Sequence, residues 1–248
     1  MPELNDTLAW DYLEKSSHDR ATIRHRRRVQ IAETDSYKNY PEAVKIELPL
    51  DWSLQETRLQ SLLQQRRSLR RYHASNQLNL NEVSFLLWAS QGITAKMGGH
   101  LLRTAPSAGA LYPIETYLVI EDVAELTAGL YHFDAGRFQL ERLVPEVRGK
   151  DAAHVCLNQD FVADANLTFF WTAVFRRSMA KYGERGFRYL FLDAGHICQN
   201  LLLATEAIGC GGCPIAAFYD QEANRLLGLD DRNERVLYAA SIGRKQRQ

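Results

Sequence analysis

Apolar residues recur at helical spacing in two stretches between residues 53 and 92. Ser53 and Glu56 have the spacing of a capping box and predict a helix that ends near the basic stretch 66–72. Asn79 and Glu82 have the same spacing and predict a second helix that runs up to Gly92. The apolar positions that would face the core are Leu59, Leu62, Leu63, Val83, Leu86 and Leu87.

The remainder of the chain reads mostly as strands around one long helix. Alternation of apolar and polar residues predicts a strand at 114–122. A turn at Asp134–Arg137 between two apolar runs predicts a hairpin. An apolar helix is predicted from about 184 to 208, with Gly209 as its C-cap. Further strands are predicted at 166–175, 213–219 and 235–243. Helices interleaved with mostly antiparallel strands indicate the α+β class, a sheet flanked by helices.

The first fifty residues differ from the rest, and we interpret 1–50 as an extension and 51–248 as the main domain. A short helix capped by Asp6 is predicted in "DTLAWDYLEKS". The basic cluster at 24–28 either forms a solvated face or binds a peptide or nucleic acid. The neutral total charge favours the solvated face. The extension would then pack loosely, cover a partner subunit or act as a docking segment.

Composition narrows the setting of the protein. The chain has 248 residues, is 46% hydrophobic, and balances 30 Lys and Arg against 30 Asp and Glu. A neutral chain is not a general polyanion binder, so we expect no nucleic-acid partner and only local anion sites. No stretch reaches the roughly 20 apolar residues needed to span a bilayer, and the polar N-terminus is unlike a secretory signal. We therefore expect a soluble cytoplasmic protein with no membrane contact and with its four cysteines as thiols.

The sequence "IGCGGCPI" (208–215) contains a C-x-x-C pair that has three interpretations. A redox pair normally opens a helix, whereas this pair follows one and precedes a strand. Structural zinc needs further ligands that the sequence does not provide, so we expect no metal site. The remaining interpretation is a glycine turn whose backbone approaches a flat, hydrogen-bonding ligand, with both cysteines as buried fillers.

Three further stretches suggest what that ligand is. "RRSLRRY" (66–72) has arginines and a hydroxyl suited to a phosphate, "RTAPSAGALYPIE" (103–115) has a turn of small residues, and "SIGRKQR" supplies Arg244. Each also has a plain reading, respectively as a basic surface, a helix-to-strand connection and a solvated tail. Together they indicate a ligand with a phosphate at one end and a planar ring at the other.

The chain resembles the SagB-type dehydrogenases, the azoline-oxidising branch of the nitroreductase superfamily. The resemblance covers about residues 58–244. The stretches that carry it are "RRSLRRY", "LLWASQGIT", "RTAPSAGALYPIETYLV", "GLYHFD", "AKYGERGFRYLFLDAGH" and "IGCGGCPIAAFYD".

This resemblance implies a nitroreductase-like fold, with a central, mainly antiparallel sheet and FMN bound at the interface of a homodimer. It assigns the phosphate and ribityl chain to Arg66, Ser68, Arg70 and Arg244, the isoalloxazine ring to Ser107 and Gly109, and the flavin N5 edge to Ile208 and Gly209. The glycines of 208–215 would then serve the flavin. The sequence contains no G-x-G-x-x-G motif, so it does not indicate a tightly bound nicotinamide.

The resemblance also makes Lys181 and Tyr182 the catalytic candidates, as a pair that transfers a proton while FMN accepts hydride. A lysine acts as a base only if burial or neighbouring cations lower its pKa, and Arg176, Arg177 and Arg185 are near in sequence. The alternative is an exposed lysine beside a packed tyrosine.

Other candidate residues have structural interpretations. Asp193 and His196 are one helical turn apart, which is an ordinary helix contact, and we expect His196 to be buried and hydrogen-bonded, either within the chain or at the dimer interface. His132 is expected at the surface beside the hairpin. Phe169, Phe170 and Trp171 are expected in the core.

Three functions compete at this stage. The first is an FMN-dependent dehydrogenase that oxidises thiazoline or oxazoline rings, or a similar C–N or C–C bond, in a peptide or carrier-bound precursor and returns electrons to oxygen. The second is an NAD(P)H-dependent nitro- or quinone reductase. The third is a flavin-binding scaffold in a modification complex with a cyclodehydratase.

Overall fold

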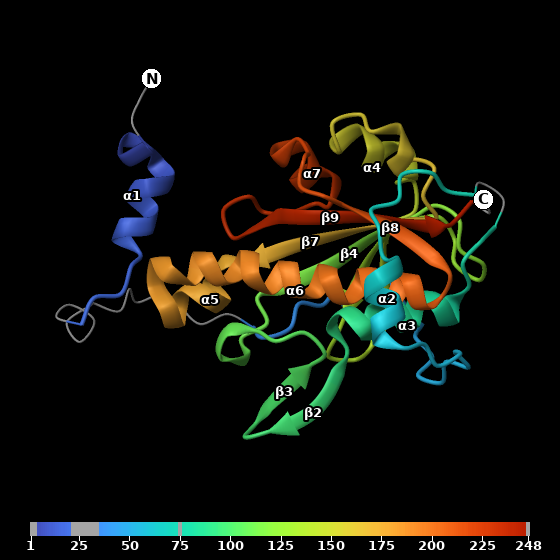
Figure 1. Cartoon of the computed structure of the whole chain (residues 1–248), viewed down its shortest axis with the longest axis horizontal. Coiled ribbons are helices and arrows are strands. Elements are labelled where there is room, and N and C mark those ends of the chain that lie inside the picture. The colour runs from blue at the N-terminus through green and yellow to red at the C-terminus, as the bar shows by residue number, and fades with distance from the viewer. Residues whose placement is uncertain (1–3, 21–34, 74–75, 247–248) are drawn as a thin grey trace.

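The protein is built around an antiparallel sheet, as the computed structural model, which describes residues 4–20, 35–73 and 76–246, shows (Figure 1). Within those residues the sheet has seven strands in the order β1–β6–β5–β4–β7–β9–β8. Every neighbouring pair is antiparallel. The strands are β1 (Val44–Glu47), β4 (Ile114–Ile120), β5 (Gly129–Asp134), β6 (Gln139–Val144), β7 (Leu167–Val174), β8 (Cys210–Ile215) and β9 (Glu234–Arg244). The expected α+β architecture with a central, mainly antiparallel sheet is confirmed.

Helices cover both faces of the sheet. The longest helix, α6 (Gly186–Ala207), crosses one face together with α2 (Leu59–Gln65) and α3 (Leu80–Gln91), and α4 (Gly149–Val155) and α7 (Asp220–Leu226) lie on the other (Figure 1). The helix α5 (Phe175–Tyr182) leads into α6 through a 3-10 turn at Gly183–Arg185. No helix in the described ranges is long and apolar enough to cross a membrane.

Two elements stand away from the main layers (Figure 1). The hairpin of β2 (Ile93–Met97) and β3 (His100–Arg103) projects from the side of α3. The N-terminal helix α1 (Leu8–Lys15) lies beyond the start of α6. Its Tyr12 hydroxyl donates to the Glu184 carbonyl at 3.1 Å, and Arg188 Nε donates to the Ser16 hydroxyl at 2.8 Å. These polar contacts attach α1 to the turn that joins α5 and α6.

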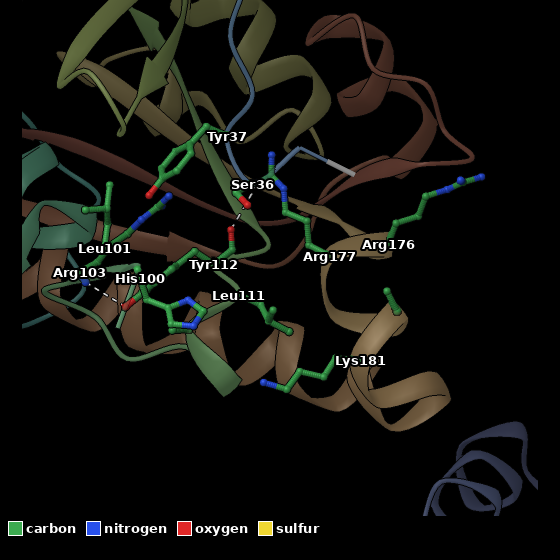
Figure 2. A pocket seen from close by; sticks show the side chains of 13 residues that line it. Ser36, Tyr37, His100, Leu101, Arg103, Leu111, Tyr112, Arg176, Arg177 and Lys181 are labelled. Carbon is green, nitrogen blue, oxygen red and sulfur yellow. Dashed lines mark hydrogen bonds between the residues drawn. The ribbon is translucent and has the colours of Figure 1, made fainter. Parts of the chain in front are cut away.

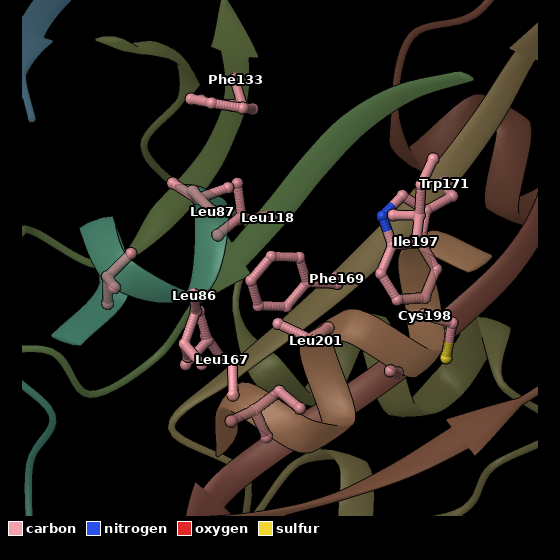
Figure 3. Packing of buried hydrophobic residues seen from close by; sticks show 14 of the residues in the cluster. Leu86, Leu87, Leu118, Phe133, Leu167, Phe169, Trp171, Ile197, Cys198 and Leu201 are labelled. Atoms are coloured by element: carbon pink, nitrogen blue, oxygen red, sulfur yellow. The ribbon is translucent and has the colours of Figure 1, made fainter. Parts of the chain in front are cut away.

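The aromatic residues of β7 form the centre of the core (Figure 3). Phe169 and Trp171 point toward α6, where they pack with Ile197, Cys198 and Leu201. Phe170 points to the opposite face and packs in the cluster under α4 and α7. All three aromatic side chains are fully buried, as the sequence predicts. Helices on both faces also explain why β4 is buried at every position and does not alternate as expected.

Local signals in the sequence predicted several element boundaries. The Asn79 side chain accepts from the Glu82 amide, and Glu82 in turn accepts from the Asn79 amide, so the expected capping box is present. The hairpin of β5 and β6 turns at Asp134–Arg137, where the Asp134 carboxylate accepts from two turn amides. The helix α6 ends at Ala207 and is followed by Gly209 at φ +71°. The helices α4, α5 and α7 were missed, as was the β2–β3 hairpin, although Gly98 and Gly99 form its two-residue turn at φ +55° and +85°.

Two predicted helix starts are wrong. The helix α2 begins at Leu59, after Arg58, with no side-chain cap, and Ser53 and Glu56 lie outside it. The reason is Trp52, whose indole donates to the Ser84 hydroxyl at 3.1 Å and packs on Trp88, which holds this segment against α3. At the N-terminus, α1 is capped by Thr7, whose hydroxyl accepts from the Trp10 amide, and not by Asp6.

Of the glycines in 208–215, Gly209 lies in a turn as predicted, whereas Gly211 and Gly212 lie in the strand β8. A Cβ on Gly212 would lie 2.5 Å from Ile242 Cδ1, and one on Gly211 would lie 2.6 Å from Leu69 Cδ2. These glycines therefore allow close packing of protein on both faces of β8. All four cysteines are free thiols, and burial raises the pKa of Cys198 and Cys210 to about 12. No cluster of metal-ligating side chains occurs in the described ranges.

Candidate functional site

A short turn at Ser107–Ala110 brings the two catalytic candidates together. Gly109 lies in this turn at φ +64°, a conformation that favours glycine. A Cβ on Gly109 would lie 2.4 Å from the Tyr182 hydroxyl and 2.6 Å from Lys181 Nζ. Only a residue without a side chain leaves room for both groups here. The structure thus places a proton-carrying pair at the end of α5 directly beside a bare backbone turn.

The helix α6 fixes the position of this turn. The Ser107 hydroxyl donates to the Asp193 carboxylate at 2.6 Å and accepts from the Tyr112 amide at 2.9 Å. Burial raises the pKa of Asp193, although the hydrogen bond from Ser107 partly opposes this effect. The expectation for His196 is wrong because its side chain is exposed, while Asp193 is buried and faces the turn. Asp193 is therefore a site residue that sequence reasoning took for an ordinary helix contact.

Lys181 and Tyr182 differ in how firmly they are held. Tyr182 is half-buried and packs edge-on against Tyr189, with ring centroids 4.9 Å apart. Lys181 is exposed, and Nζ forms no hydrogen bond or ion pair with any side chain in the part of the chain described. Of the neighbouring cations, Arg177 binds Glu115 and Arg185 donates to the Ser16 carbonyl at 3.0 Å. The lysine is therefore accessible to a ligand that enters from the side of the turn.

A second cluster lies at the opposite end of α6. Arg244, at the end of β9, donates from Nη1 to the Ile208 carbonyl at 3.2 Å and from Nη2 to Glu82 at 2.6 Å. Gly209 follows Ile208, is exposed and has nothing within 4 Å of its Cβ position. Three of the residues that the resemblance assigns to FMN are thereby brought together.

The basic stretch 66–72 runs beside this cluster along the edge of β8. Ser68 bridges to Gly212, and the Leu69 amide donates to the Gly212 carbonyl at 3.0 Å. Arg66 ends α2, and the Arg70 guanidinium lies 5.8 Å from the Phe161 ring centroid. As far as the structure is described, neither guanidinium has a carboxylate partner. Unpaired guanidiniums, a hydroxyl and an open backbone turn form a donor set that fits a phosphate monoester.

The two clusters are separated by most of the length of α6. Asp193 holds the Gly109 turn near the start of the helix, and Ile208 follows its end. At 1.5 Å of rise per residue, these positions are about 22 Å apart along the helix axis. The ten candidate residues of the sequence therefore fall into two separate groups within one chain.

A cavity of about 590 Å³ adjoins the Lys181 side of the turn (Figure 2). Its lining comes from the β2–β3 hairpin, from α5, from residues 110–112 and from the segment at Ser36 and Tyr37. Sequence reasoning missed Tyr37, His100 and Arg103 as lining residues. They come from separate segments, and no local pattern shows that these segments meet.

Beneath this cavity the sheet contains a buried ionic network. His132 is fully buried, with Nδ1 2.9 Å from Glu141 and Nε2 3.2 Å from Glu115, so its expected surface position is wrong. Burial lowers the pKa of His132, but its hydrogen bonds to both carboxylates outweigh burial and raise it overall. Burial raises the pKa of Glu115, yet His132 and Arg177 hold it at about 2. Every charged group in this network therefore has an opposite partner.

A larger and more apolar hollow, of about 1020 Å³, lies beside α6. Phe175, Phe187, Phe191 and Phe218 contribute to its lining. On the same helix Phe191 is 52% exposed and Leu192 is 58% exposed, which is unusual for side chains of this size.

The sequence comparisons give a consistent assignment. The sequence profile described as the Nitroreductase family matches residues 63–244. A putative nitroreductase of Methanocaldococcus jannaschii is 35% identical over 204 residues, which are 82% of this chain and 98% of that protein. The trifolitoxin-processing protein TfxB of Rhizobium leguminosarum bv. trifolii is 29% identical over 181 residues, with 69% of this chain and 48% of TfxB covered. The microcin B17-processing protein McbC of Escherichia coli is 24% identical over 180 residues, with 68% and 63% covered.

Solved structures agree with the sequence comparisons. A putative nitroreductase from Anabaena variabilis superposes with a TM-score of 0.74 at 26% identity and covers 94% of this chain and 45% of that chain. The E. coli microcin synthetase McbBCD complex with truncated pro-MccB17 bound matches at 0.62 and 22% identity, covering 82% and 79%. The NADPH:FMN oxidoreductase from Vibrio harveyi matches at 0.53 and 18% identity, covering 75% and 68%, and like McbBCD supports the fold alone. The chain therefore belongs to the nitroreductase family.

Proposed function

We propose that this chain is an FMN-dependent dehydrogenase that oxidises thiazoline or oxazoline rings, or a similar C–N or C–C bond, in a peptide natural-product precursor. The observation that carries the proposal is the convergence of Lys181 Nζ and the Tyr182 hydroxyl on the Gly109 turn. A reductase that only passes hydride from a nicotinamide to an acceptor does not require two such groups beside the ring. The relationship to TfxB and McbC adds support, because both are named as peptide-processing proteins.

The proposed reaction removes one proton and one hydride from the azoline ring and leaves an aromatic azole. FMN held by the candidate residues would supply a two-electron acceptor for the hydride, with oxygen as the final electron acceptor. Lys181 Nζ would accept the proton from the carbon beside the carbonyl, and bound substrate and flavin would supply the burial that this exposed side chain lacks in the free protein. The Tyr182 hydroxyl would donate a hydrogen bond to the substrate beside Lys181 and thereby hold the azoline ring in place. The Gly109 backbone leaves the space in which a flat ring lies against both groups.

The second cluster supports the assignment of FMN. Arg66, Ser68, Arg70 and Arg244 would bind its phosphate and ribityl chain, Ser107 and Gly109 would lie against its ring, and Ile208 and Gly209 would face its N5 edge. The guanidiniums of Arg66 and Arg70, which lack carboxylate partners in the described part of the chain, support the phosphate assignment.

We further propose that the active unit is a homodimer in which each site combines clusters from two copies. Within one copy the Gly109 turn and the Ile208–Arg244 cluster lie at opposite ends of α6, about 22 Å apart. A second copy packed along α6 would bring its own Gly109 turn to the arginine cluster of the first. The apolar hollow and the exposed Phe191 and Leu192 on α6 support such a contact.

A cyclodehydratase is the proposed partner for the preceding step, since it forms the azoline ring that this reaction consumes. The sequence relationship to McbC, which is named as a microcin B17-processing protein, supports a role in such a pathway. Residues 1–50 remain the candidate docking segment. Of these, the basic cluster at 24–28 lies outside the described residues, while α1 presents Leu8 at 89% exposure. A docking partner would cover such a side chain.

The alternative function is an NAD(P)H-dependent nitro- or quinone reductase. One observation favours it specifically, namely the 35% identity with a putative nitroreductase over nearly the whole of that protein. A nicotinamide that stacks only transiently on the flavin needs few dedicated residues, so this function remains in competition.

One experiment separates the two functions. The purified protein is mixed under anaerobic conditions either with NADPH or with a thiazoline-containing peptide, and the flavin absorbance is followed. Bleaching by the peptide, with formation of a thiazole detected by mass spectrometry, supports the dehydrogenase. Fast bleaching by NADPH with no reaction of the peptide would replace it with the reductase. A protein that takes up no FMN would contradict both.

A further inference from the structure

The cavity beside Lys181 has a strongly one-sided charge (Figure 2). Its charged lining residues are Arg103, Arg176, Arg177 and Lys181, with His100 in addition, and none of the lining residues is acidic. A surface cavity in a chain of zero net charge has no general reason to gather one sign of charge. The concentration of cations is therefore a local property of this cavity.

Arg103 is the most informative of these residues. Its side chain comes from the end of β3 and is only 8% exposed. Nη1 donates to Gln91 at 2.7 Å, and the guanidinium is stacked 4.7 Å from the ring centroid of Tyr112 and 5.5 Å from that of Tyr37. Its Nε is buried and has no hydrogen-bond partner. A buried donor without a partner is costly, and a bound acceptor would remove that cost.

The nearest buried carboxylate does not neutralise this charge. Glu115 binds Arg177 and His132, and its side chain is buried below the cavity. Burial lowers the pKa of Arg103, and Glu115 only partly offsets this effect. Because Glu115 is shared by Arg177 and Arg103, while His132 also binds Glu141, the floor of the cavity retains an excess of positive charge from Arg103. An anion entering the cavity would be attracted by this excess.

The neighbouring groups favour an anion with two coplanar oxygens. The Tyr37 ring lies against the Arg103 guanidinium, and both side chains line the cavity (Figure 2). A guanidinium offers parallel donors that match a carboxylate, and a tyrosine hydroxyl adds one more. Arg176 extends away from the other labelled side chains and marks the rim.

We propose that this cavity is a carboxylate-binding subsite that selects substrates carrying a free carboxylate next to the ring to be oxidised. The carboxylate would bind at Arg103 and Tyr37 and thereby orient the ring toward Lys181. This inference rests on the proposed function for the identity of the ring, but the anion site itself is defined by Arg103 and its surroundings.

The test uses a matched pair of product analogues, so that no turnover is needed. An acetyl-glycyl thiazole-4-carboxylic acid and its primary amide are titrated into the FMN-loaded protein by isothermal calorimetry at fixed ionic strength. A charge-assisted hydrogen bond predicts that the acid binds at least about tenfold more tightly than the amide. Arg103→Gln should reduce this ratio to about two or less. If Arg103→Gln does not fold, Tyr37→Phe replaces it as the test. This variant removes only a hydroxyl and should reduce the acid-to-amide ratio several-fold.

The matched control is Arg225→Gln, an exposed arginine on α7, which should leave the ratio unchanged. Equal binding of acid and amide to the unmodified protein would overturn the subsite, as would an acid preference that survives both variants. NADPH binding that depends on Arg103, with no acid preference, would assign the cavity to a nucleotide phosphate and overturn the carboxylate. If thiazoline peptides are not oxidised while the Arg103-dependent acid preference is present, the proposed function fails and the subsite stands.

Discussion

Arg177 and Lys181 lie one turn apart on α5, yet their surroundings are opposite. Arg177 is buried and bound to Glu115, to the Asp35 carbonyl and to the Tyr112 carbonyl. Lys181 is exposed, and its Nζ lies together with the Tyr182 hydroxyl beside Gly109. Among the residues described it has no ion-pair partner. A cation that is buried and ion-paired stabilises the fold, whereas an exposed cation without an ion-pair partner is accessible to a ligand. The difference indicates which of the two cations has a chemical role.

The largest effect is expected for Lys181→Met. Loss of the proposed proton acceptor should lower kcat for thiazoline oxidation by about 10²- to 10⁴-fold. Because the side chain is exposed, the free energy of unfolding should change by less than about 0.5 kcal/mol. Steady-state kinetics and urea denaturation measure the two quantities. Lys150→Met, another exposed lysine, should change neither, and undiminished oxidation by the Lys181 variant would contradict its role.

A mixing experiment tests whether the Lys181 and arginine clusters act across two copies. An Arg66→Ala/Arg70→Ala variant and a Lys181→Met variant should each be inactive alone. If each site uses one cluster from each copy, co-expression gives mixed dimers with one intact site, and about a quarter of the activity returns. Tagging the two variants differently allows purification of the co-expressed protein, and its thiazoline oxidation rate measures the recovered activity. No recovery in mixed dimers would place both clusters of a site in one copy.

The opposite result is expected at the buried position on α5. Arg177→Met leaves Glu115 buried without its guanidinium partner and should lower the free energy of unfolding by about 3–5 kcal/mol. The exposed neighbour provides the control, since Arg176→Met should cost less than about 0.5 kcal/mol. Urea denaturation distinguishes the two. Equal stability of both variants would mean that the buried pair contributes nothing.

The smallest effect is a dependence of stability on pH that comes from His132. Its pKa is raised in the folded state, so the folded protein keeps a proton that the unfolded chain releases near pH 6.5. The stabilisation is therefore complete below about pH 6.5 and is lost as the pH rises through the folded pKa, by up to about 1.4 kcal/mol per pH unit. Unfolding of the protein and of His132→Gln between pH 6 and 9 measures this. If the free energy of unfolding of His132→Gln depends on pH as strongly as that of the unmodified protein, other groups cause the dependence.

Features that depend on neighbouring residues were predictable from the sequence. The capping box at Asn79, the turn at Asp134 and the end of α6 at Gly209 each rest on a few adjacent residues. Apolar runs with Phe169 and Trp171 likewise identified the central strand. The fold class follows from the order of such elements.

Features that depend on contacts between distant segments were not predictable. His132 lies between Tyr131 and Phe133 in β5 and points to the other face of the strand. The sequence does not show that Tyr40 covers that face, with its ring centroid 5.2 Å from His132. The approach of Asp193 to Ser107 spans 86 residues, and the cavity around Arg103 joins four segments. For the candidate site, the resemblance supplied Lys181, Tyr182 and the turn with Ser107 and Gly109, but not Asp193 or the residues that line the cavity.

The strand order has a consequence for how the protein is made. β9 lies between β7 and β8 in the sheet, although it follows both in the chain. During translation the ribosome must therefore release residues 234–244 before β8 can join the sheet, and Arg244 arrives last of the ten candidate residues. A nascent chain that stalls earlier exposes the glycine-rich edge of β8 and has no complete arginine cluster. If FMN binds as proposed, its uptake requires synthesis past residue 244, and flavin colour then marks chains that contain the whole of β9.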